Sequence, residues 1–144
     1  MQVDEKTVRG IRVRTKNSAE MNPEKAKIAG LWQRFYADIA PTLSQQASVL
    51  GVYCNYASDL AGEYDVLAGS DMLKDEHAAE SVAIKGGRYL VFEGKGGLPE
   101  IVIETWSKVW DYFSSDQSDY TRAYTTDFEL YNGDNEIQIF IAIE

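Results

Sequence analysis

Cysteine and histidine are almost absent from this sequence of 144 residues, which contains one of each. A single cysteine cannot form an internal disulfide, and one cysteine with one histidine cannot complete a structural zinc site. Basic residues are also few, with 14 Lys and Arg against 23 Asp and Glu, so the net charge is -9. This charge disfavours binding to nucleic acid or to an anionic membrane, because both are polyanions.

Long apolar runs are missing as well. No apolar stretch approaches the roughly 20 residues that span a bilayer, and the first residues, MQVDEK, contain no apolar leader core. The content of 44% hydrophobic and 26% charged residues is that of an ordinary globular protein. The length fits one domain. We therefore expect a single cytoplasmic domain over residues 1–144, with no membrane contact.

Two segments carry apolar residues at helical spacing. The first begins at Asn22-Pro23, because asparagine is a common N-cap and proline suits the first helical position. It ends at Pro41, and its apolar face includes Trp32 and Phe35, which we expect in the core. The second begins at residues 98–100 and repeats apolar residues at helical intervals.

The remaining apolar segments are typical of strands. They cover residues 7–16, 49–56, 63–72, 81–84, 88–93, 120–131 and 136–143. Turn residues predict a hairpin between 49–56 and 63–72 and another across Asn132-Gly133, and the strands flanking Gly86-Gly87 are also expected to pair. The order predicts two βαββ halves, about 4–74 and 80–144, of an α+β fold. We expect one antiparallel sheet, two main helices and a central ligand groove.

Few residues suit metal or nucleophilic chemistry. His77 has no carboxylates nearby at ligand spacing, so we interpret it as a loop residue. Cys54 lies on the apolar face of its strand and is expected to be a buried, unreactive thiol. The glycines at 94, 96 and 97 lack both the Gly-Lys-Ser/Thr ending of a phosphate loop and the dinucleotide fingerprint. We therefore predict no metal and no cofactor, and we assign no catalytic residue.

The strand at residues 127–131 carries the most informative polar pattern. Phe128 and Leu130 share one face, which leaves Asp127, Glu129 and Tyr131 together on the other. A carboxylate among tyrosines on a concave face attracts a cation, and the ring faces add about 0.5–2 kcal/mol each. The same pattern fits an exposed acidic strand equally well. The residues alone leave both interpretations open.

Five short motifs resemble the GyrI-like small-molecule-binding domain, which is also the effector-binding domain of AraC-type and multidrug-sensing MerR-type transcription activators. In that family's order they are Leu31-Trp32-Gln33-Arg34-Phe35, Gly51-Val52-Tyr53, Tyr64-Asp65-Val66-Leu67-Ala68-Gly69, Gly87-Arg88-Tyr89-Leu90-Val91-Phe92 and Asp127-Phe128-Glu129-Leu130-Tyr131. The resemblance covers essentially the whole chain. The sequence is also similar to stand-alone forms found among the products of mobile integron gene cassettes.

The resemblance implies a groove that binds hydrophobic, often cationic compounds between a carboxylate and aromatic walls. By position, Glu129 is the expected charge partner. The expected walls are Tyr89, Trp106, Tyr53, Trp110 and Tyr131. The tyrosines agree with the alternation along their strands, whereas the two tryptophans rest on the resemblance.

Three functions fit such a groove. The preferred hypothesis is a stand-alone binding module for amphipathic cationic small molecules, such as drugs or toxins. Direct DNA binding is not expected, since no helix-turn-helix segment precedes the first strand. The second hypothesis is a hydrolase of strained toxins with Glu129 as general base. The third is a protein-interaction inhibitor of a DNA-handling enzyme such as gyrase, which would act through an acidic surface.

Overall fold

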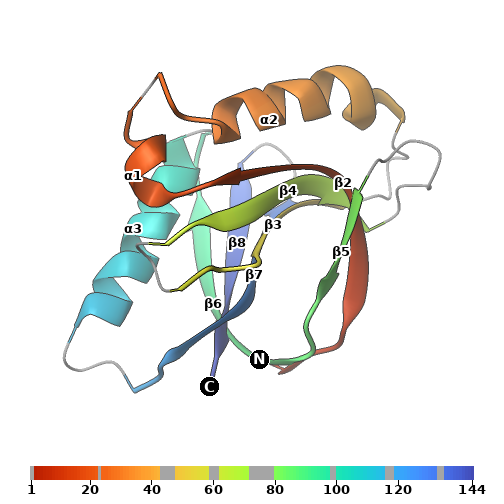
Figure 1. The fold of residues 1–144 in the computed structure, drawn as a ribbon. Helices are drawn as coiled ribbons and strands as arrows, with labels where there is room; N and C mark the ends of the chain where they lie inside the picture. The colour runs from red at the N-terminus through yellow and green to blue at the C-terminus, as the bar shows by residue number, and fades with distance from the viewer. Residues whose placement is uncertain are drawn as a thin grey trace.

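The computed structural model describes residues 2–22, 24–42, 48–58, 62–71, 80–97, 100–115, 119–132 and 135–144. It contains one curled antiparallel sheet of eight strands, with two main helices packed against it (Figure 1). The predicted α+β class is confirmed. Within these ranges, no helix has the length and apolar character that crossing a membrane would need.

The strands lie in the order β1-β6-β8-β7-β3-β4-β2-β5 across the sheet. Their bounds are β1 Gln2–Val3, β2 Lys6–Thr15, β3 Val49–Cys54, β4 Tyr64–Ser70, β5 Glu80–Ile84, β6 Gly87–Lys95, β7 Arg122–Asn132 and β8 Glu136–Ile143. The antiparallel β3–β4 and β7–β8 pairs agree with the two predicted hairpins; the turn residue Gly133 lies outside the described residues. The order is symmetric about the central β3–β7 pair, so these two strands lie where the two halves of the chain meet.

The strands on either side of Gly86-Gly87 do not pair with each other, so that prediction was wrong. Strand β5 pairs with β2, and β6 pairs with β8, toward opposite ends of the sheet. Strand β6 bonds to a strand of its own half, whereas β5 bonds to β2 of the first half. Both pairings extend the eight-stranded sheet, which buries more apolar surface than a short isolated hairpin would.

The first main helix starts later than predicted. After one turn of helix, α1 (Asn17–Glu20), the chain enters α2 (Ile28–Arg34). The Glu20 carboxylate accepts hydrogen bonds from the backbone N–H groups of Lys27 and Ile28, whereas the Asn22 side chain accepts from Glu24 within a turn. An anion that satisfies unpaired N–H groups stabilises a helix start, which explains why α2 begins there. Pro23 lies outside the described residues.

The same helix also continues further than predicted. It widens into one π-helical turn, η1 (Phe35–Ile39), and then tightens into a 3-10 turn, η2 (Ala40–Thr42), so that it passes Pro41 instead of ending before it. The second main helix, α3 (Glu100–Ser114), begins where the sequence predicted.

Apolar clusters lie on both faces of the sheet. Leu31 of α2, Phe35 of η1 and Val109 of α3 pack against one face, and we call the surface of the sheet beneath these helices the helix face. Side chains from strands of both halves, Phe128 and Tyr89 among them, form one cluster on the opposite face. Polar groups on either face of the central strands are therefore enclosed.

Candidate ligand-binding site

Glu129 lies at the centre of the helix face, on β7 where the two halves of the chain meet. Its neighbours across the ladder are Gly51 of β3 and Ile139 of β8. A Cβ at Gly51 would lie 2.7 Å from Glu129 Oε1 and 3.0 Å from Cζ2 of Trp32. The glycine therefore leaves the space that the carboxylate and the tryptophan ring occupy.

Three aromatic side chains donate hydrogen bonds to the Glu129 carboxylate. Trp106 Nε1 and the Tyr53 hydroxyl donate to Oε2 at 2.5 and 2.9 Å, and the Tyr131 hydroxyl donates to Oε1 at 2.7 Å. The tryptophan comes from α3, and the tyrosines come from β3 and β7. Because Glu129 is only 1% exposed, these donors take the place of water around the carboxylate.

Burial sets the ionisation of this cluster. Loss of solvent raises the pKa of Glu129, and the hydrogen bonds from Trp106, Tyr131 and Tyr53 offset only part of that rise. Burial and the adjacent carboxylate raise the pKa of Tyr53 and Tyr131 well above the usual range of a phenol. The tyrosines are therefore neutral donors, and the carboxylate is protonated more easily than an exposed one.

In the part of the chain that the structure describes, Glu129 has no cationic partner, since no Lys or Arg there forms an ion pair with it. Asp127, two residues earlier on the same face of β7, is equally buried, but Arg122 Nη2 lies 2.6 Å from its Oδ2. The missing counter-charge is therefore particular to Glu129 and does not follow from its place in the strand.

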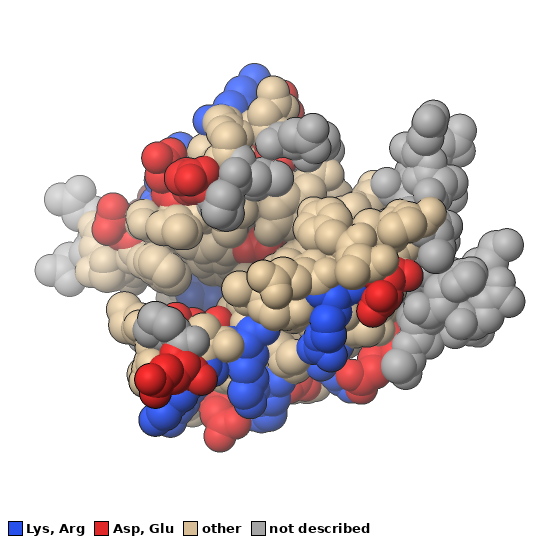
Figure 2. All heavy atoms as spheres, turned by 90° about the horizontal axis from the view of Figure 1, so that it is seen from above, with Lys and Arg blue, Asp and Glu red and all other residues tan. Residues whose placement is uncertain are grey.

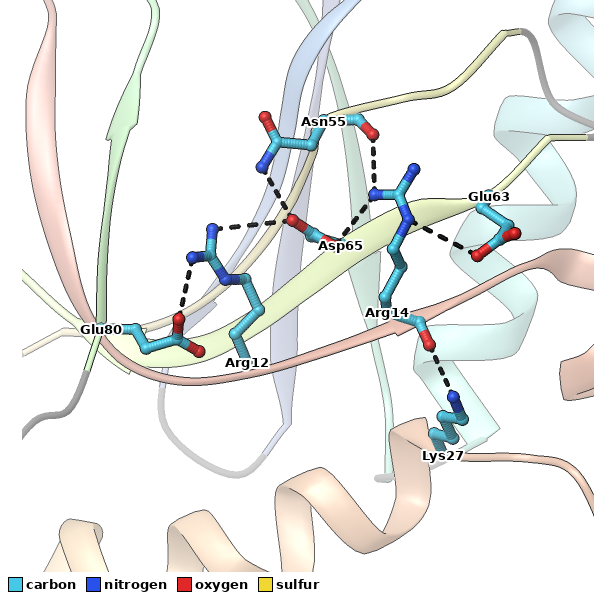
Figure 3. A network of polar contacts seen from close by, with 7 residues as sticks. All are labelled: Arg12, Arg14, Lys27, Asn55, Glu63, Asp65 and Glu80. Atoms are coloured by element: carbon cyan, nitrogen blue, oxygen red, sulfur yellow. Dashed lines mark hydrogen bonds and ion pairs between the residues drawn. The ribbon is translucent and has the colours of Figure 1, made fainter.

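The arginines of β2 are paired with other carboxylates (Figure 3). Arg12 lies 2.9 Å from Glu80 and 3.6 Å from Asp65, and Arg14 lies 3.0 Å from Asp65 and 3.5 Å from Glu63. They alternate along β2 with residues that pack under α2, so they point away from the helix face. These cations do not neutralise Glu129.

Aromatic rings lie on both sides of the carboxylate and reach the surface. On the α2 side, the ring centroid of Trp32 lies 5.4 Å from that of Tyr131 and 5.9 Å from that of Tyr36, which is 51% exposed. On the α3 side, the centroids of Trp106 and Trp110 lie 6.1 Å apart, and Trp110 is 48% exposed. Seen from above, residues other than Lys, Arg, Asp and Glu cover much of the middle of the molecule (Figure 2). Aromatic rings therefore continue from Glu129 to exposed positions on both sides.

Most of the predicted site residues come together. The residues in direct contact with one another are Glu129, Tyr53, Trp106 and Tyr131. Trp110 lies beside Trp106 at the rim. What these residues bind stays a prediction.

Tyr89 does not belong to this group. It is buried on the opposite face of the sheet, where its ring lies 5.5 Å from that of Phe128 and its hydroxyl donates to the Lys85 carbonyl at 2.6 Å. Its strand presents Phe92, not Tyr89, to α3. The motif located the strand correctly, but the pleat directs this tyrosine to the other side.

Sequence analysis missed Trp32 and Gly51 as parts of the site. Trp32 was expected to be core, yet it is only partly buried and lies above the carboxylate. One signal was present, because Trp32 and Trp106 occupy similar places in the two helices. No sequence pattern indicated that a side chain at position 51 would collide with Glu129.

Metal and thiol chemistry find no support among the described residues. No group of three or more His, Cys, Asp or Glu in these ranges is arranged to hold a metal ion. Cys54 is buried as predicted, and burial raises the pKa of its thiol to about 11, so the thiol stays protonated near neutral pH. His77 lies outside the described residues.

The fold and this carboxylate-centred aromatic cluster define an effector-binding domain. Residues 1–143 match the family model described as "Cass2: Integron-associated effector binding protein". The chain therefore belongs to the Cass2 family, which confirms the resemblance to effector-binding domains and to integron cassette products.

Several relatives share the whole length of the chain. The integron cassette protein VCH_CASS2 of Vibrio cholerae has 42% identity and a TM-score of 0.94, over 100% of this chain and 94% of that one. "Putative transcriptional regulator protein YobU" of Bacillus subtilis (strain 168) is 29% identical, over 99% of this chain and 94% of its own. SAV2435, solved with bound tetraphenylphosphonium, has 23% identity and a TM-score of 0.72, over 100% of this chain and 92% of its own. This comparison shows that the two proteins share a fold.

Proposed function

We propose that this protein binds hydrophobic, cationic small molecules against Glu129. The observation that carries the proposal is a carboxylate 1% exposed, surrounded by aromatic side chains and without a cationic partner among the described residues. A buried, unpaired carboxylate costs free energy, and a bound cation would remove that cost. The neighbouring Asp127 is neutralised internally by Arg122 and has no such need.

The surrounding rings favour a flat, aromatic cation over a small inorganic one. Each tryptophan or tyrosine face attracts a cation by about 0.5–2 kcal/mol, and apolar contact contributes about 25 cal/mol for each Å² removed from water. Trp32 and Trp106 come from opposite helices and flank the carboxylate, so a ligand with several rings would contact both.

Charge should decide most of the selectivity. At a separation of roughly 6 Å and an effective dielectric constant of about 20, one charge pair contributes about 2.8 kcal/mol, or about a hundredfold in Kd. A ligand of the same shape with the opposite charge should therefore bind far more weakly.

The relatives support this class of ligand. SAV2435 binds tetraphenylphosphonium, which is a hydrophobic cation with four rings, and YobU bears the name of a transcriptional regulator. We infer that the present chain senses or sequesters a compound of this kind, and that any effect on transcription passes through the bound state of this domain.

The test compares tetraphenylphosphonium with tetraphenylborate, an anion of nearly the same size and shape, by tryptophan fluorescence titration in potassium-free buffer. Glu129 should attract the cation and repel the anion by about 2.8 kcal/mol each, so the wild-type protein should prefer the cation by about ten-thousandfold, and Glu129→Gln should lose that preference. Equal affinity for the two ions in the wild-type protein, or a preference that Glu129→Gln retains, would contradict the proposal. Glu104→Gln, at an exposed position of α3, removes the same charge and is the matched control.

A further inference from the structure

A second buried charge lies beside Glu129 on the helix face, and it is internally neutralised. Asp127 Oδ2 accepts hydrogen bonds from Arg122 Nη2 at 2.6 Å and from the Tyr56 hydroxyl at 2.5 Å, and Oδ1 accepts the Ala142 backbone N–H at 2.9 Å. Asp127 is 0% exposed and Arg122 is 9% exposed. The pair carries no net charge, and both carboxylate oxygens have donors.

One donor of this pair has no acceptor. The Nε–H of Arg122 is buried and makes no hydrogen bond with any residue that the structure describes. The guanidinium carbon lies 4.5 Å from the ring centroid of Tyr124 and 5.9 Å from that of Phe113, so rings hold the group in place without accepting from Nε. A buried donor without a partner costs free energy, and such groups commonly mark the place of a bound water or ligand.

The backbone at this point is strained in a way that brings Arg122 to Asp127. The β7–β8 register shifts between Arg122 and Asp127, and Tyr124 within the bulge has a φ of 53°, which is unfavourable for a residue with a side chain. Bulges and strained residues gather at binding sites because they redirect side chains. Here the bulge allows Arg122 to reach Asp127, five residues further along the same strand.

We propose that Arg122 Nε is a second contact point of the same ligand site and donates a hydrogen bond to a neutral oxygen, such as a ketone or amide carbonyl, of the bound cation. An anionic group is disfavoured, because Asp127 already neutralises the guanidinium. Asp127 and Glu129 lie two residues apart on one strand face, which separates them by roughly 7 Å, and Arg122 binds Asp127. The ligand would therefore carry its carbonyl at least about one phenyl ring away from its cation. This inference rests on the proposed function and names the ligand class more closely: aromatic cations with a carbonyl group.

Two probes that differ in one group test the inference. The para-benzoylbenzyl trimethylammonium ion carries a carbonyl between its rings, and the para-benzylbenzyl trimethylammonium ion carries a methylene there. The wild-type protein should bind the carbonyl probe about tenfold more tightly, as expected for a hydrogen bond from a charged donor. In addition, the carbonyl stretch of the bound probe should move to lower wavenumber than in a solvent without hydrogen-bond donors. This infrared measurement needs no variant.

The matched variant is Arg122→Met together with Asp127→Asn. It deletes the Nε donor but leaves the net charge unchanged, and the asparagine can still accept from Ala142 and donate to the Tyr56 hydroxyl. The methionine preserves the apolar stem beside Phe113 and Tyr124. The double variant should bind both probes with equal affinity and should still require Glu129.

The outcomes separate the two proposals. One outcome would overturn the role of Arg122 and leave the proposed function intact. In it, the wild-type protein binds both probes with equal affinity, the carbonyl stretch does not shift, and Glu129→Gln weakens binding. Nε would then contact only water. A carbonyl preference that persists in the double variant would overturn it as well. If neither probe binds the wild-type protein, both this inference and the proposed function are wrong for this class of cation.

Discussion

Replacing Glu129 with glutamine should stabilise the ligand-free protein near neutral pH. Glutamine has nearly the same shape, and its amide can keep a hydrogen bond with each of the three partners: the oxygen accepts from Trp106 and Tyr53, and the nitrogen donates to the Tyr131 hydroxyl oxygen. The substitution therefore removes a buried charge while each partner keeps a hydrogen bond to residue 129.

The size of this gain depends on pH. Burial raises the pKa of Glu129 in the folded state above the ordinary carboxyl pKa that it has in the unfolded state. The wild-type protein therefore loses stability as pH rises from the ordinary pKa through the raised pKa, because Glu129 then ionises in the folded protein. Below the ordinary pKa, Glu129 is neutral in both states and the two proteins should be equally stable.

At higher pH the magnitude follows from opposing contributions. Desolvation of the charge costs several kcal/mol, and the three hydrogen bonds offset most but not all of that cost, so we expect a remainder on the order of 1 kcal/mol. This remainder corresponds to a rise of about 2–4 °C in the unfolding midpoint for a chain of this size.

The assay is thermal unfolding by circular dichroism in buffers from about pH 4 to about pH 8, across which a raised carboxyl pKa acts on stability. Glu104→Gln is again the control, because it removes one exposed charge from the same acidic protein. The difference between the two variants should be absent at the acid end and should grow with pH. If Glu129→Gln unfolds at a lower temperature than Glu104→Gln at the alkaline end, the carboxylate is stabilised more by its hydrogen bonds than it is penalised by burial, and the reasoning is refuted.

Three further changes probe the same site. Gly51→Ala places a Cβ 2.7 Å from Glu129 Oε1, so it should lower the free energy of unfolding by about 1–3 kcal/mol and should also lower the cation affinity; Gly30→Ala, with nothing within 4 Å of the new Cβ, should do neither. Trp106→Phe keeps most of the ring but deletes a hydrogen-bond donor that lowers the pKa of Glu129, so that pKa should rise. A ligand titration repeated over pH should then show that cation binding begins at a higher pH than in the wild-type protein. Trp110→Ala should weaken tetraphenylphosphonium binding severalfold while changing stability by less than about 1 kcal/mol, because this ring is 48% exposed. Unchanged affinity in a titration of Trp110→Ala would remove this ring from the site.

Alternation along the strands predicted much of the arrangement. It placed Asp127, Glu129 and Tyr131 on one face of β7, and the structure has Glu129 and Tyr131 in direct contact. It did not predict whether that face is covered, since an exposed strand and a strand beneath two helices can share one pattern. Burial of Glu129 depends on Trp106, which approaches from a helix that lies elsewhere in the sequence.

The parts that could not be predicted depend on contacts between distant segments. Alternation indicates which residues of β6 share a face, but only the packing of α3 decides that Phe92 faces the helix and Tyr89 does not. The pairing of Arg122 with Asp127 requires a bulge, and neighbouring residues in the sequence give no clear signal for it. The start of α2 likewise depends on Glu20, a residue outside the helix itself.

The π-helical turn η1 has a consequence for how this family can vary. A π turn accommodates one more residue than an α turn, so η1 winds the chain between Trp32 and the residues after Ile39 less tightly than a uniform α-helix would. If the same residues were wound as α-helix throughout, the part after the turn would rotate against the part before it by about 100°. Either the anchor at Ile39 or the ring above Glu129 would then leave its place. Substitutions that replace the π turn by α-helical winding are therefore expected to alter which ligands fit, even where every residue that touches the ligand is retained.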